Sequence, residues 1–387
     1  MMNLMADRLR ELPPYLFARI DRMKSEALSR GVDVIDLGVG DPDVPTPPKI
    51  VDRLAAAARE AGAHHYSSYS GIRKLREAFS EWFRDRFAVE LDPDGEVLPL
   101  LGSKEGIGNI CFALLNPGDE VLVPDPGYPV YTAGATLAGA VPRHFPLYEE
   151  NGFLPDGESL RKLVTAKTKM LWLNYPSNPT GVVAKVEDYE KGIRLARKGG
   201  FVLCHDAAYS EIVFDGKKAP SILQVQGAKE TAVEFHSLSK TFCMPGWRVG
   251  FAAGNRDVIS ALARVKTNLD SGIFLPVQEA AVTALRECRE DAERIRAVFE
   301  NRRNRFVGAL NGAGWKVAAP PATFYVWMKV PDGADSMGFT SRLLQECGIV
   351  STPGTGFGPN GEGFVRMSLT LPENRLDLAI ERLRRLR

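Results

Sequence analysis

The chain has 387 residues, of which 44% are hydrophobic and 25% are charged, and its formal net charge is +1. This near-neutral balance excludes the strongly basic surface of a nucleic-acid-binding protein. The five cysteines are scattered without CxxC spacing, so we predict neither a disulfide framework nor a zinc site. The N-terminus lacks a basic start followed by an apolar stretch, and no window approaches about 18 uninterrupted apolar residues. We therefore expect a cytoplasmic protein without membrane contact.

The N-terminal part of the chain predicts helices and one short strand. Residues 7–30 have an amphipathic helical pattern that paired prolines interrupt. Residues 34–48 begin as an apolar strand and continue into a glycine- and proline-rich loop around Gly40, where backbone can approach a ligand closely. Helices follow over residues 49–61 and, after a polar loop with two tyrosines, over residues 72–83.

The middle of the chain alternates short apolar runs with helical segments. Runs that are apolar on both faces are typical of a mostly parallel sheet covered by helices on both sides, so we predict a large α/β domain over residues 49–275. In such sheets ligands bind beyond the carboxyl ends of the strands, where several of these runs end in polar residues. The runs are 97–101, 120–124, 169–174, 201–206, 232–237 and 248–254.

The C-terminal part predicts a second, smaller domain. A chain longer than about 250–300 residues exceeds the usual size of one hydrophobic core. A long helical region over residues 276–310 leaves the large domain, and residues 311–387 then have the pattern of an α+β domain with an antiparallel sheet. We expect residues 1–48 to join this smaller domain.

One lysine, Lys240, lies in the segment HSLSKTFCMPGWRVG among small hydroxyl residues and upstream of an arginine. A lysine amine can condense with a carbonyl cofactor, and hydroxyls together with a guanidinium group suit a phosphate dianion. The phosphate candidates are Ser237, Ser239 and Arg248. The alternative is an exposed lysine in a loop rich in serine and threonine.

Polar residues after other strands suit the same kind of cofactor. Asp206 in HDAAYSE could keep a pyridine nitrogen protonated, and Tyr209 could donate to a ring oxygen; the alternative is an aspartate that caps the next helix. Asn178 in NYPSNPTG is either a rigid amide donor or a turn residue. The backbone of Ser103–Lys104 opens a predicted helix and could bind a phosphate, and Tyr128 could stack on a ring or belong to the core.

Taken in order along nearly the whole chain, these motifs resemble the fold-type I pyridoxal-phosphate enzymes, specifically the class I/II aminotransferases. The matching pieces are LGVGDPD, HYSSYSGIRKLREA, GSKEG, DPGYPVY, NYPSNPTG, HDAAYSE, SLSKTFCMPGWRVG and GFVRMSL. The resemblance implies an α/β fold with a mostly parallel seven-stranded sheet and a smaller α+β domain. It also implies pyridoxal 5'-phosphate as cofactor and a ping-pong transfer of an amino group between an L-amino acid and a 2-oxo acid.

The resemblance also implies roles for single residues. Lys240 would bind the cofactor covalently and then move the substrate's α-proton. Asp206 would pair with the ring nitrogen, Asn178 and Tyr209 would bind the ring 3-oxygen, and Tyr128 would stack on the ring.

For the phosphate, the resemblance implies the side chains of Ser237, Ser239 and Arg248 with the backbone of Ser103–Lys104. Tyr66 would reach the partner's phosphate across a homodimer interface. The substrate α-carboxylate would be bound by Arg366, whose fork meets a carboxylate bidentately, with help from Gly40 and Asn178.

Within this family the N-terminal half is most similar to the LL-diaminopimelate aminotransferase branch, which uses 2-oxoglutarate and serves lysine biosynthesis. The branch usually carries a glutamate where this chain has Ser70, which puts its substrate recognition in doubt. The side-chain pocket is expected near Tyr15, Tyr69 and Ser271. The alternatives are an aminotransferase for alanine, an aromatic amino acid or N-succinyl-diaminopimelate, or a C–S lyase of the same fold. A regulator would need a DNA-binding domain for which the N-terminal segment leaves no room.

Overall fold

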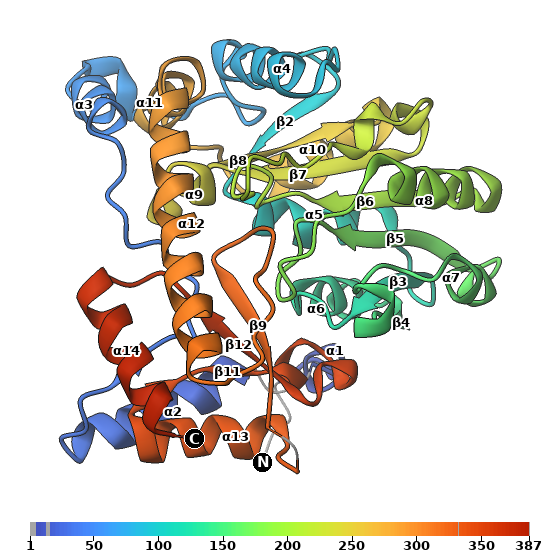
Figure 1. The fold of residues 1–387 in the computed structure, drawn as a ribbon. Helices are drawn as coiled ribbons and strands as arrows, with labels where there is room; N and C mark the ends of the chain where they lie inside the picture. Colours follow the sequence, from blue (N-terminus) through green and yellow to red (C-terminus); the bar gives the residue numbers. More distant parts are fainter. Residues whose placement is uncertain (1–4, 13–15, 332, 387) are drawn as a thin grey trace.

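The computed structural model describes residues 5–12, 16–331 and 333–386. Its largest sheet has seven strands in the order β2-β8-β7-β6-β5-β3-β4 (Figure 1). Strand β8 runs antiparallel to β2 and β7, and the other neighbouring pairs are parallel. The predicted mostly parallel seven-stranded sheet is therefore confirmed. The strands are β2 (Val97–Leu100), β3 (Glu120–Asp125), β4 (Val141–Pro146), β5 (Thr168–Asn174), β6 (Val202–Asp206), β7 (Ala232–Ser237) and β8 (Gly250–Gly254).

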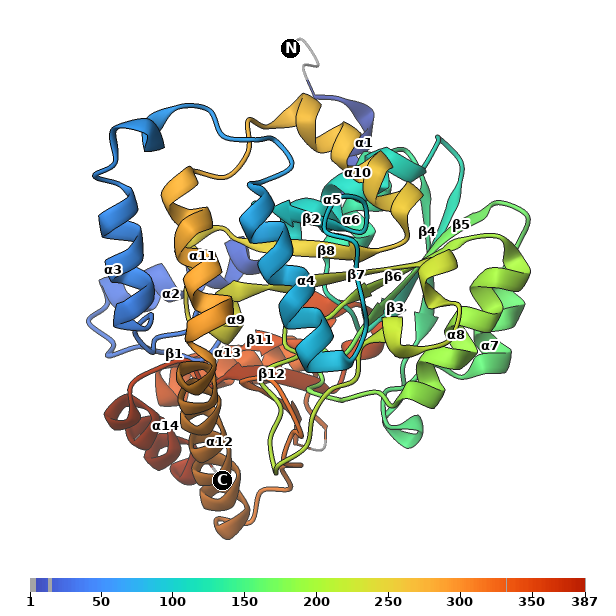
Figure 2. The ribbon, with the colours of Figure 1, turned by 90° about the horizontal axis from the view of Figure 1, so that it is seen from above.

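Helices cover both faces of this sheet because alternate side chains along each strand point to opposite sides. On one face Leu203 packs in a core shared with α4 (Arg73–Phe87), α7 (Gly157–Leu163), α8 (Val186–Gly199) and α11 (Leu275–Glu287). Figure 2 shows α4 lying over β7 and β8. On the other face Cys204 packs in a core shared with α5 (Ser103–Leu114), α6 (Val130–Leu137) and α10 (Arg256–Leu269). The helix α3 (Pro48–Ala57) packs against α11.

A second core lies beside the large sheet. The antiparallel strands β9 (Tyr325–Lys329), β12 (Phe364–Ser368) and β11 (Thr352–Pro353) form it with β1 (Ile35–Asp36), which pairs in parallel with β10 (Ile349–Val350). The surrounding helices are α2 (Leu16–Ser29), α13 (Ser336–Cys347) and α14 (Glu373–Arg385). Figure 1 shows α12 (Arg289–Gly312) running from the large sheet to the small one. Short 3-10 turns are η1 (Ala61–His64), η2 (Glu149–Asn151), η3 (Ile222–Gln224), η4 (Ala228–Glu230), η5 (Pro245–Trp247), η6 (Gly354–Phe357) and η7 (Pro359–Gly361).

Two sequence predictions need correction. Strand β4 was missed because it is an edge strand whose residues VPRHFP are mostly exposed or half-buried, so it lacks an apolar run. The long helical region predicted over 276–310 is two helices, α11 and α12, separated at Cys288, whose ψ of 29° is not helical. As predicted, the helical pattern over 7–30 is not one continuous helix, since it contains two described helices, α1 (Asp7–Arg10) and α2. Within the described residues, no helix is long and apolar enough to cross a membrane.

Candidate active site

The carboxyl ends of the central strands meet along one edge of the seven-stranded sheet. Asn174 at the end of β5 is the register partner of Asp206 at the end of β6. Gly250, at the start of β8, pairs with Leu100 on one side and with Ser237 on the other. Loops that follow β2, β5, β6 and β7 therefore emerge side by side, as the sequence predicted from their polar ends.

Asp206 is a buried carboxylate whose hydrogen-bond partners are neutral. Oδ2 accepts a hydrogen bond of 2.8 Å from the hydroxyl of Tyr131, and Oδ1 accepts one of 3.1 Å from the backbone N–H of Ala208. Burial raises the pKa of Asp206 above its ordinary value of 3.8, although the bonds from Tyr131 and Ala208 oppose that rise. Within the described residues Asp206 forms no ion pair, so its charge suits a cationic ligand.

Two residues that support Asp206 were missed by the sequence analysis. Tyr131 is buried and stacks on Trp172 with ring centroids 4.8 Å apart, which fixes its hydroxyl beneath the carboxylate. Asn174 donates from Nδ2 to the carbonyl of Asp206 at 2.8 Å, and its Oδ1 accepts from the backbone N–H of Asn178 at 2.9 Å. Both lie inside quoted motifs, but no residue type or spacing separates them from ordinary core and turn residues.

Arg366 is a buried cation whose partners are also neutral. Nη1 donates to Oδ1 of Asn178 at 2.8 Å, and Nη2 donates to the carbonyl of Gly38 at 2.7 Å. The guanidinium carbon lies 4.0 Å from the ring centroid of Tyr325 and 4.8 Å from that of Phe357, so aromatic faces hold it in place. Among the residues with described side chains no carboxylate pairs with Arg366, and the site can therefore take an anion.

Lys240 lies in the short helix α9 (Leu238–Thr241) that follows β7. Its Nζ is 6.0 Å from the ring centroid of Tyr209 and 5.7 Å from that of Phe324. The hydroxyls of Tyr209 and Tyr325 are 3.0 Å apart, and burial raises the pKa of Tyr209 well above its ordinary value. Tyr209 is therefore a neutral hydrogen-bonding group at ordinary pH.

A cradle for an anion lies at the start of α5. Gly102, with a φ of +80°, precedes this helix, and a Cβ there would come within 2.4 Å of Nη2 of Arg248. A Cβ on Gly250 would lie 2.9 Å from the backbone nitrogen of Ser103. Ser237 caps α9 by accepting from the backbone N–H of Ser239 at 3.2 Å. The helix N-terminus, the guanidinium group and the serine hydroxyl thus belong to one neighbourhood.

The other predicted residues differ in where the structure places them. Lys104 is exposed with its Nζ 5.9 Å from the ring centroid of Tyr128, and a Cβ on Gly40 would come within 2.0 Å of the hydroxyl of Tyr325. Tyr66 is 86% exposed in the loop before α4, so it does not lie within the buried cluster. Tyr15 lies outside the described residues.

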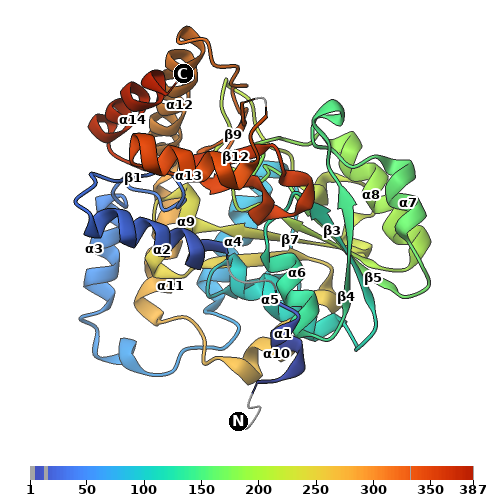
Figure 3. The ribbon, with the colours of Figure 1, turned by 90° about the horizontal axis from the view of Figure 1, so that it is seen from below.

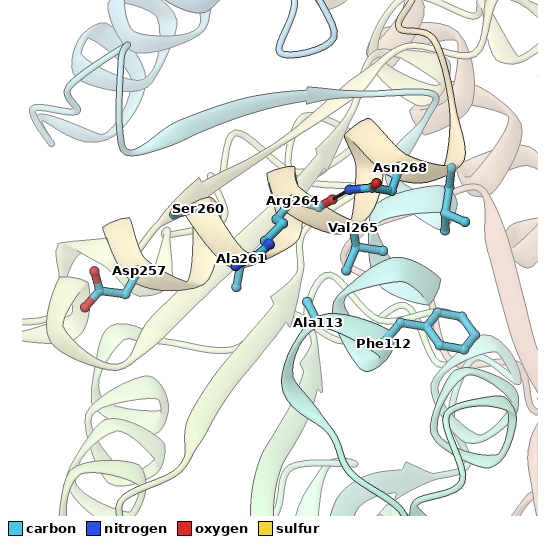
Figure 4. A pocket seen from close by; sticks show the side chains of 9 residues that line it. Phe112, Ala113, Asp257, Ser260, Ala261, Arg264, Val265 and Asn268 are labelled. Carbon is cyan, nitrogen blue, oxygen red and sulfur yellow. Dashed lines mark hydrogen bonds between the residues drawn. The ribbon is translucent and has the colours of Figure 1, made fainter.

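A separate surface groove lies away from these buried charges. It measures about 770 Å³ and lies between α5 and α10 (Figure 4). Its lining includes Phe112 and Leu269, which are 49% and 65% exposed, and no residue of its lining is a buried charged one. The buried charges rather than this volume therefore mark the candidate active site. No group of side chains suited to a metal ion occurs among the described residues.

Comparison with known proteins identifies the family. The family described as aminotransferase class I and II matches residues 32–383. The chain belongs to this family. It is 50% identical to the LL-diaminopimelate aminotransferase of Aquifex aeolicus over 99% of both chains, and 49% identical to that of Desulforudis audaxviator over 98% of this chain and 97% of the other. The substrate-bound structure of BacF from Bacillus subtilis has a TM-score of 0.95 at 36% identity, covering 100% of this chain and 98% of that one.

Class I and II aminotransferases use pyridoxal 5'-phosphate, and the residues of this site fit that cofactor. The buried carboxylate of Asp206 suits a protonated ring nitrogen, because its present partners carry no positive charge. The cradle formed by Gly102, Ser103, Ser237 and Arg248 suits a phosphate dianion. The chain is therefore a pyridoxal-phosphate-dependent aminotransferase, as its motifs predicted.

Proposed function

We propose that the chain is an LL-diaminopimelate aminotransferase, which transfers an amino group from LL-diaminopimelate to 2-oxoglutarate or in the reverse direction. The choice of substrate is supported by the relatives of that name, which are 49% and 50% identical over nearly the full length. The observation that carries the chemistry is the pairing of a buried anion, Asp206, with a buried cation, Arg366, neither of which has a described ion-pair partner.

Each residue of the cluster has a defined role in this proposal. When bound, the cofactor supplies a protonated aromatic ring that withdraws electrons from the substrate's α-carbon. Asp206 keeps the ring nitrogen protonated, and Tyr131 holds the carboxylate in place. Lys240 would hold the cofactor through its amine, and its Nζ, when free, would take the proton from the substrate's α-carbon.

Arg366 binds and orients the substrate's α-carboxylate in this proposal. Its guanidinium plane is fixed by Tyr325 and Phe357, and its fork is preorganised for two parallel hydrogen bonds. Asn178 holds Nη1 and contributes its amide to the same site, and the tight approach of Gly40 to Tyr325 brings backbone next to it. Tyr209 and Asn178 would hydrogen-bond the ring oxygen, and Tyr128 would stack on the ring. The phosphate would be held by the side chains of Ser237, Ser239 and Arg248 and by the Ser103–Lys104 backbone.

The distal end of the substrate is assigned to the loop before α4. Ser70, whose Oγ lies 3.2 Å from that of Ser68, can donate to a carboxylate and accept from an ammonium group. We propose that this hydroxyl contacts the distal end in place of the glutamate that is usual in the branch. We assign the side-chain pocket to this loop together with Tyr15 and Ser271.

A homodimer is part of the proposal, with Tyr66 reaching the partner's phosphate site. Large apolar and aromatic side chains gather at one edge of the chain, on the loop before α4 and around α10. They are Tyr66, Tyr69, Phe112, Leu269 and Phe274. Exposed patches of this kind are typical of interfaces, and a partner subunit is the occupant we propose.

The same proposal includes the domain boundaries and the cell compartment. Residues 49–275 form the cofactor-binding domain, 276–310 connect it, and 311–387 with 1–48 form the smaller domain; the core shared by Leu37 and the C-terminal strands supports this division. All five cysteines are free and buried, which is consistent with the reducing cytoplasm.

A half-reaction screen tests the proposed substrate. Purified holoenzyme is mixed with one amino acid at a time, and the absorbance of the bound cofactor is followed. We expect a fast and complete change with LL-diaminopimelate and glutamate and a slow one with alanine or phenylalanine. The reverse ranking would overturn the proposed substrate. Release of pyruvate and ammonia without an oxo-acid acceptor would overturn transamination itself.

A further inference from the structure

One buried amide joins two loops that are far apart in the sequence. Gln278 in α11 has no exposed surface. Its Nε2 donates to Oγ of Ser67 at 2.9 Å and to the carbonyl of Ile273 at 2.7 Å, while its Oε1 accepts from the backbone N–H of Ile72 at 2.8 Å. The loop before α4 and the loop before α11 are thus bonded to the same side chain.

The two loops are also packed directly against each other. Gly272 has a φ of +87°, and a Cβ there would lie 3.0 Å from the carbonyl oxygen of Ser68. Figures 2 and 3 show the two connections side by side at one edge of the molecule. Asp270 fixes the second loop because it accepts from the backbone N–H of Gly272 at 2.7 Å and from Nζ of the buried Lys266 at 2.7 Å.

This bonded pair of loops presents aromatic side chains to solvent. Tyr66 is 86% exposed, Tyr69 is 45% exposed and Phe274 is 48% exposed. Large apolar side chains on a surface are costly unless a partner covers them, and a contact made from a rigid loop loses less conformational entropy than one made from a mobile loop. The buried bonds of Gln278 therefore hold loops whose exposed aromatic side chains are open to a partner.

We propose that Gln278 is a positioning residue that acts in trans: it holds the loop that carries Tyr66 in the shape required by the cofactor-phosphate site of the other subunit. This proposal rests on the proposed dimer with Tyr66 shared across its interface. It adds that the strength of cofactor binding in one subunit depends on a buried amide of the other.

The first measurement compares homodimeric variants. Gln278→Leu removes all three hydrogen bonds at nearly constant volume, and Ser67→Ala removes one of them without touching the core. We expect the affinity of the apoenzyme for pyridoxal 5'-phosphate, measured by absorbance titration, to fall about tenfold in Gln278→Leu and about two- to threefold in Ser67→Ala. An unchanged affinity in both variants overturns the proposal.

The matched control is Gln224→Leu. Gln224 also joins two segments, since Nε2 donates to the carbonyl of Phe87 at 3.1 Å and Oε1 accepts from the backbone N–H of Ser221 at 2.9 Å. It lies at the far end of α4, away from the two loops. We expect its cofactor affinity to equal that of the wild type. An equal fall in Gln224→Leu would mean that loss of any such bond weakens binding, and it would overturn the specific role.

A hybrid dimer separates action in trans from action within one subunit. Chains carrying Lys240→Ala and chains carrying Gln278→Leu are co-expressed with different tags, and the mixed dimer is purified. Its one competent site has Lys240 from the Gln278→Leu chain and receives Tyr66 from the Lys240→Ala chain, whose Gln278 is intact. We expect about half the wild-type turnover per dimer and wild-type dependence on cofactor concentration. A hybrid that keeps the weak cofactor dependence of the Gln278→Leu homodimer overturns the proposal.

A second hybrid tests the shared site on its own. If Tyr66 acts across the interface, a dimer of Lys240→Ala and Tyr66→Phe chains recovers the cofactor affinity that the Tyr66→Phe homodimer has lost. Absence of that recovery contradicts the proposed shared site, whereas recovery here without recovery for Gln278→Leu contradicts only the role of Gln278.

Discussion

Two buried arginines of this chain differ in the charge of their hydrogen-bond partners. Arg302 in α12 meets the carboxylate of Asp43 with both terminal nitrogens, at 2.6 and 2.9 Å. Among the described residues, Arg366 in β12 donates hydrogen bonds only to an amide oxygen and a backbone carbonyl. Because a buried cation without an anion is costly, the first arginine is complete within the fold and the second is suited to a ligand.

Two buried carboxylates of the central strands differ in the same way: one is paired with imidazoles and the other has neutral partners. Glu234 on β7 has no exposed surface and lies between two imidazoles, 2.8 Å from Nδ1 of His205 and 2.6 Å from Nε2 of His236. Asp206, which directly follows His205, points to the opposite face of the sheet and has neutral partners. Adjacent positions of one strand thus serve the framework and the site. Asp125 is a further buried carboxylate without an ion pair, but both of its oxygens accept from Asn360 and link β3 to the loop before β12.

The largest effect on turnover is expected from removing the amine of Lys240. Lys240→Ala should reduce transamination by about 10⁴-fold or more, because no neighbouring described group can replace its amine as base and cofactor ligand. Turnover with the preferred amino acid and the absorbance of the bound cofactor are the measurements. Near-normal turnover would show that another residue carries out the proton transfer.

Asp206→Asn tests whether the site tolerates the loss of its anion. We expect turnover to fall about 10²–10³-fold, because a neutral amide does not stabilise a protonated ring nitrogen. In the cofactor-free protein, by contrast, the same substitution should raise the stability of the fold. Burial raises the pKa of Asp206, so its contribution to folding is greatest when it is protonated and is lost as the pH rises from 3.8 through the raised pKa.

The cofactor-free Asp206→Asn variant should therefore melt at a higher temperature than the wild type at pH 7, and the difference should shrink toward pH 4. Thermal unfolding of both apoproteins over this pH range measures it. A lower melting temperature at pH 7 would show that Tyr131 and Ala208 already compensate the charge fully.

Arg366→Lys should raise KM for the amino acid about 100-fold with a smaller change in kcat, since an ammonium group cannot form the bidentate contact. The matched control is Arg302→Lys, which changes the same kind of side chain at a site that is already paired with Asp43. We expect the control to lower the melting temperature and to leave KM close to the wild-type value. If both variants changed KM equally, the distinction between paired and unpaired arginines would fail.

Much of the fold could be predicted because the central strands are buried on both faces. Their apolar runs are continuous and coincide closely with β2, β3, β5, β6, β7 and β8. Strand β4 lies at the edge with only β3 as neighbour, and its Arg143 and His144 remain in solvent, so burial imposes no apolar run on it. The break at Cys288 depends on packing between helices, which a periodic pattern does not encode.

The candidate site was predictable where an unusual residue follows a strand. Asp206 is the last residue of β6 and Lys240 lies in α9, the short helix after β7, and the chain topology brings such strand ends together. Tyr131 and Asn174 were not predictable, because their roles come from hydrogen bonds across neighbouring elements rather than from their residue type. The same holds for Gln278, two of whose bonds reach positions more than 200 residues away, while the third reaches the loop just before its own helix.

The smallest effect on turnover is expected for Glu234→Gln, which removes the carboxylate charge between the imidazoles of His205 and His236. An amide can accept from one imidazole and donate to the other, so packing is kept, while the loss of charged hydrogen bonds should cost about 1–3 kcal/mol of stability at pH 7. Burial alone would raise the pKa of Glu234, but His236 and His205 outweigh burial and hold the pKa well below its ordinary value of 4.5.

The stability that Glu234 contributes is therefore present above pH 4.5 and is lost as the pH falls toward the lowered pKa. The difference in unfolding free energy between wild type and Glu234→Gln should narrow over that acidic range, as measured by denaturant unfolding at several pH values. Turnover per folded molecule should stay close to wild type, because Glu234 and its imidazoles face away from Asp206. A large loss of turnover in a fully folded variant would mean that this network shapes the site through the strand backbone, and paired charges would then belong to function as well as to the framework.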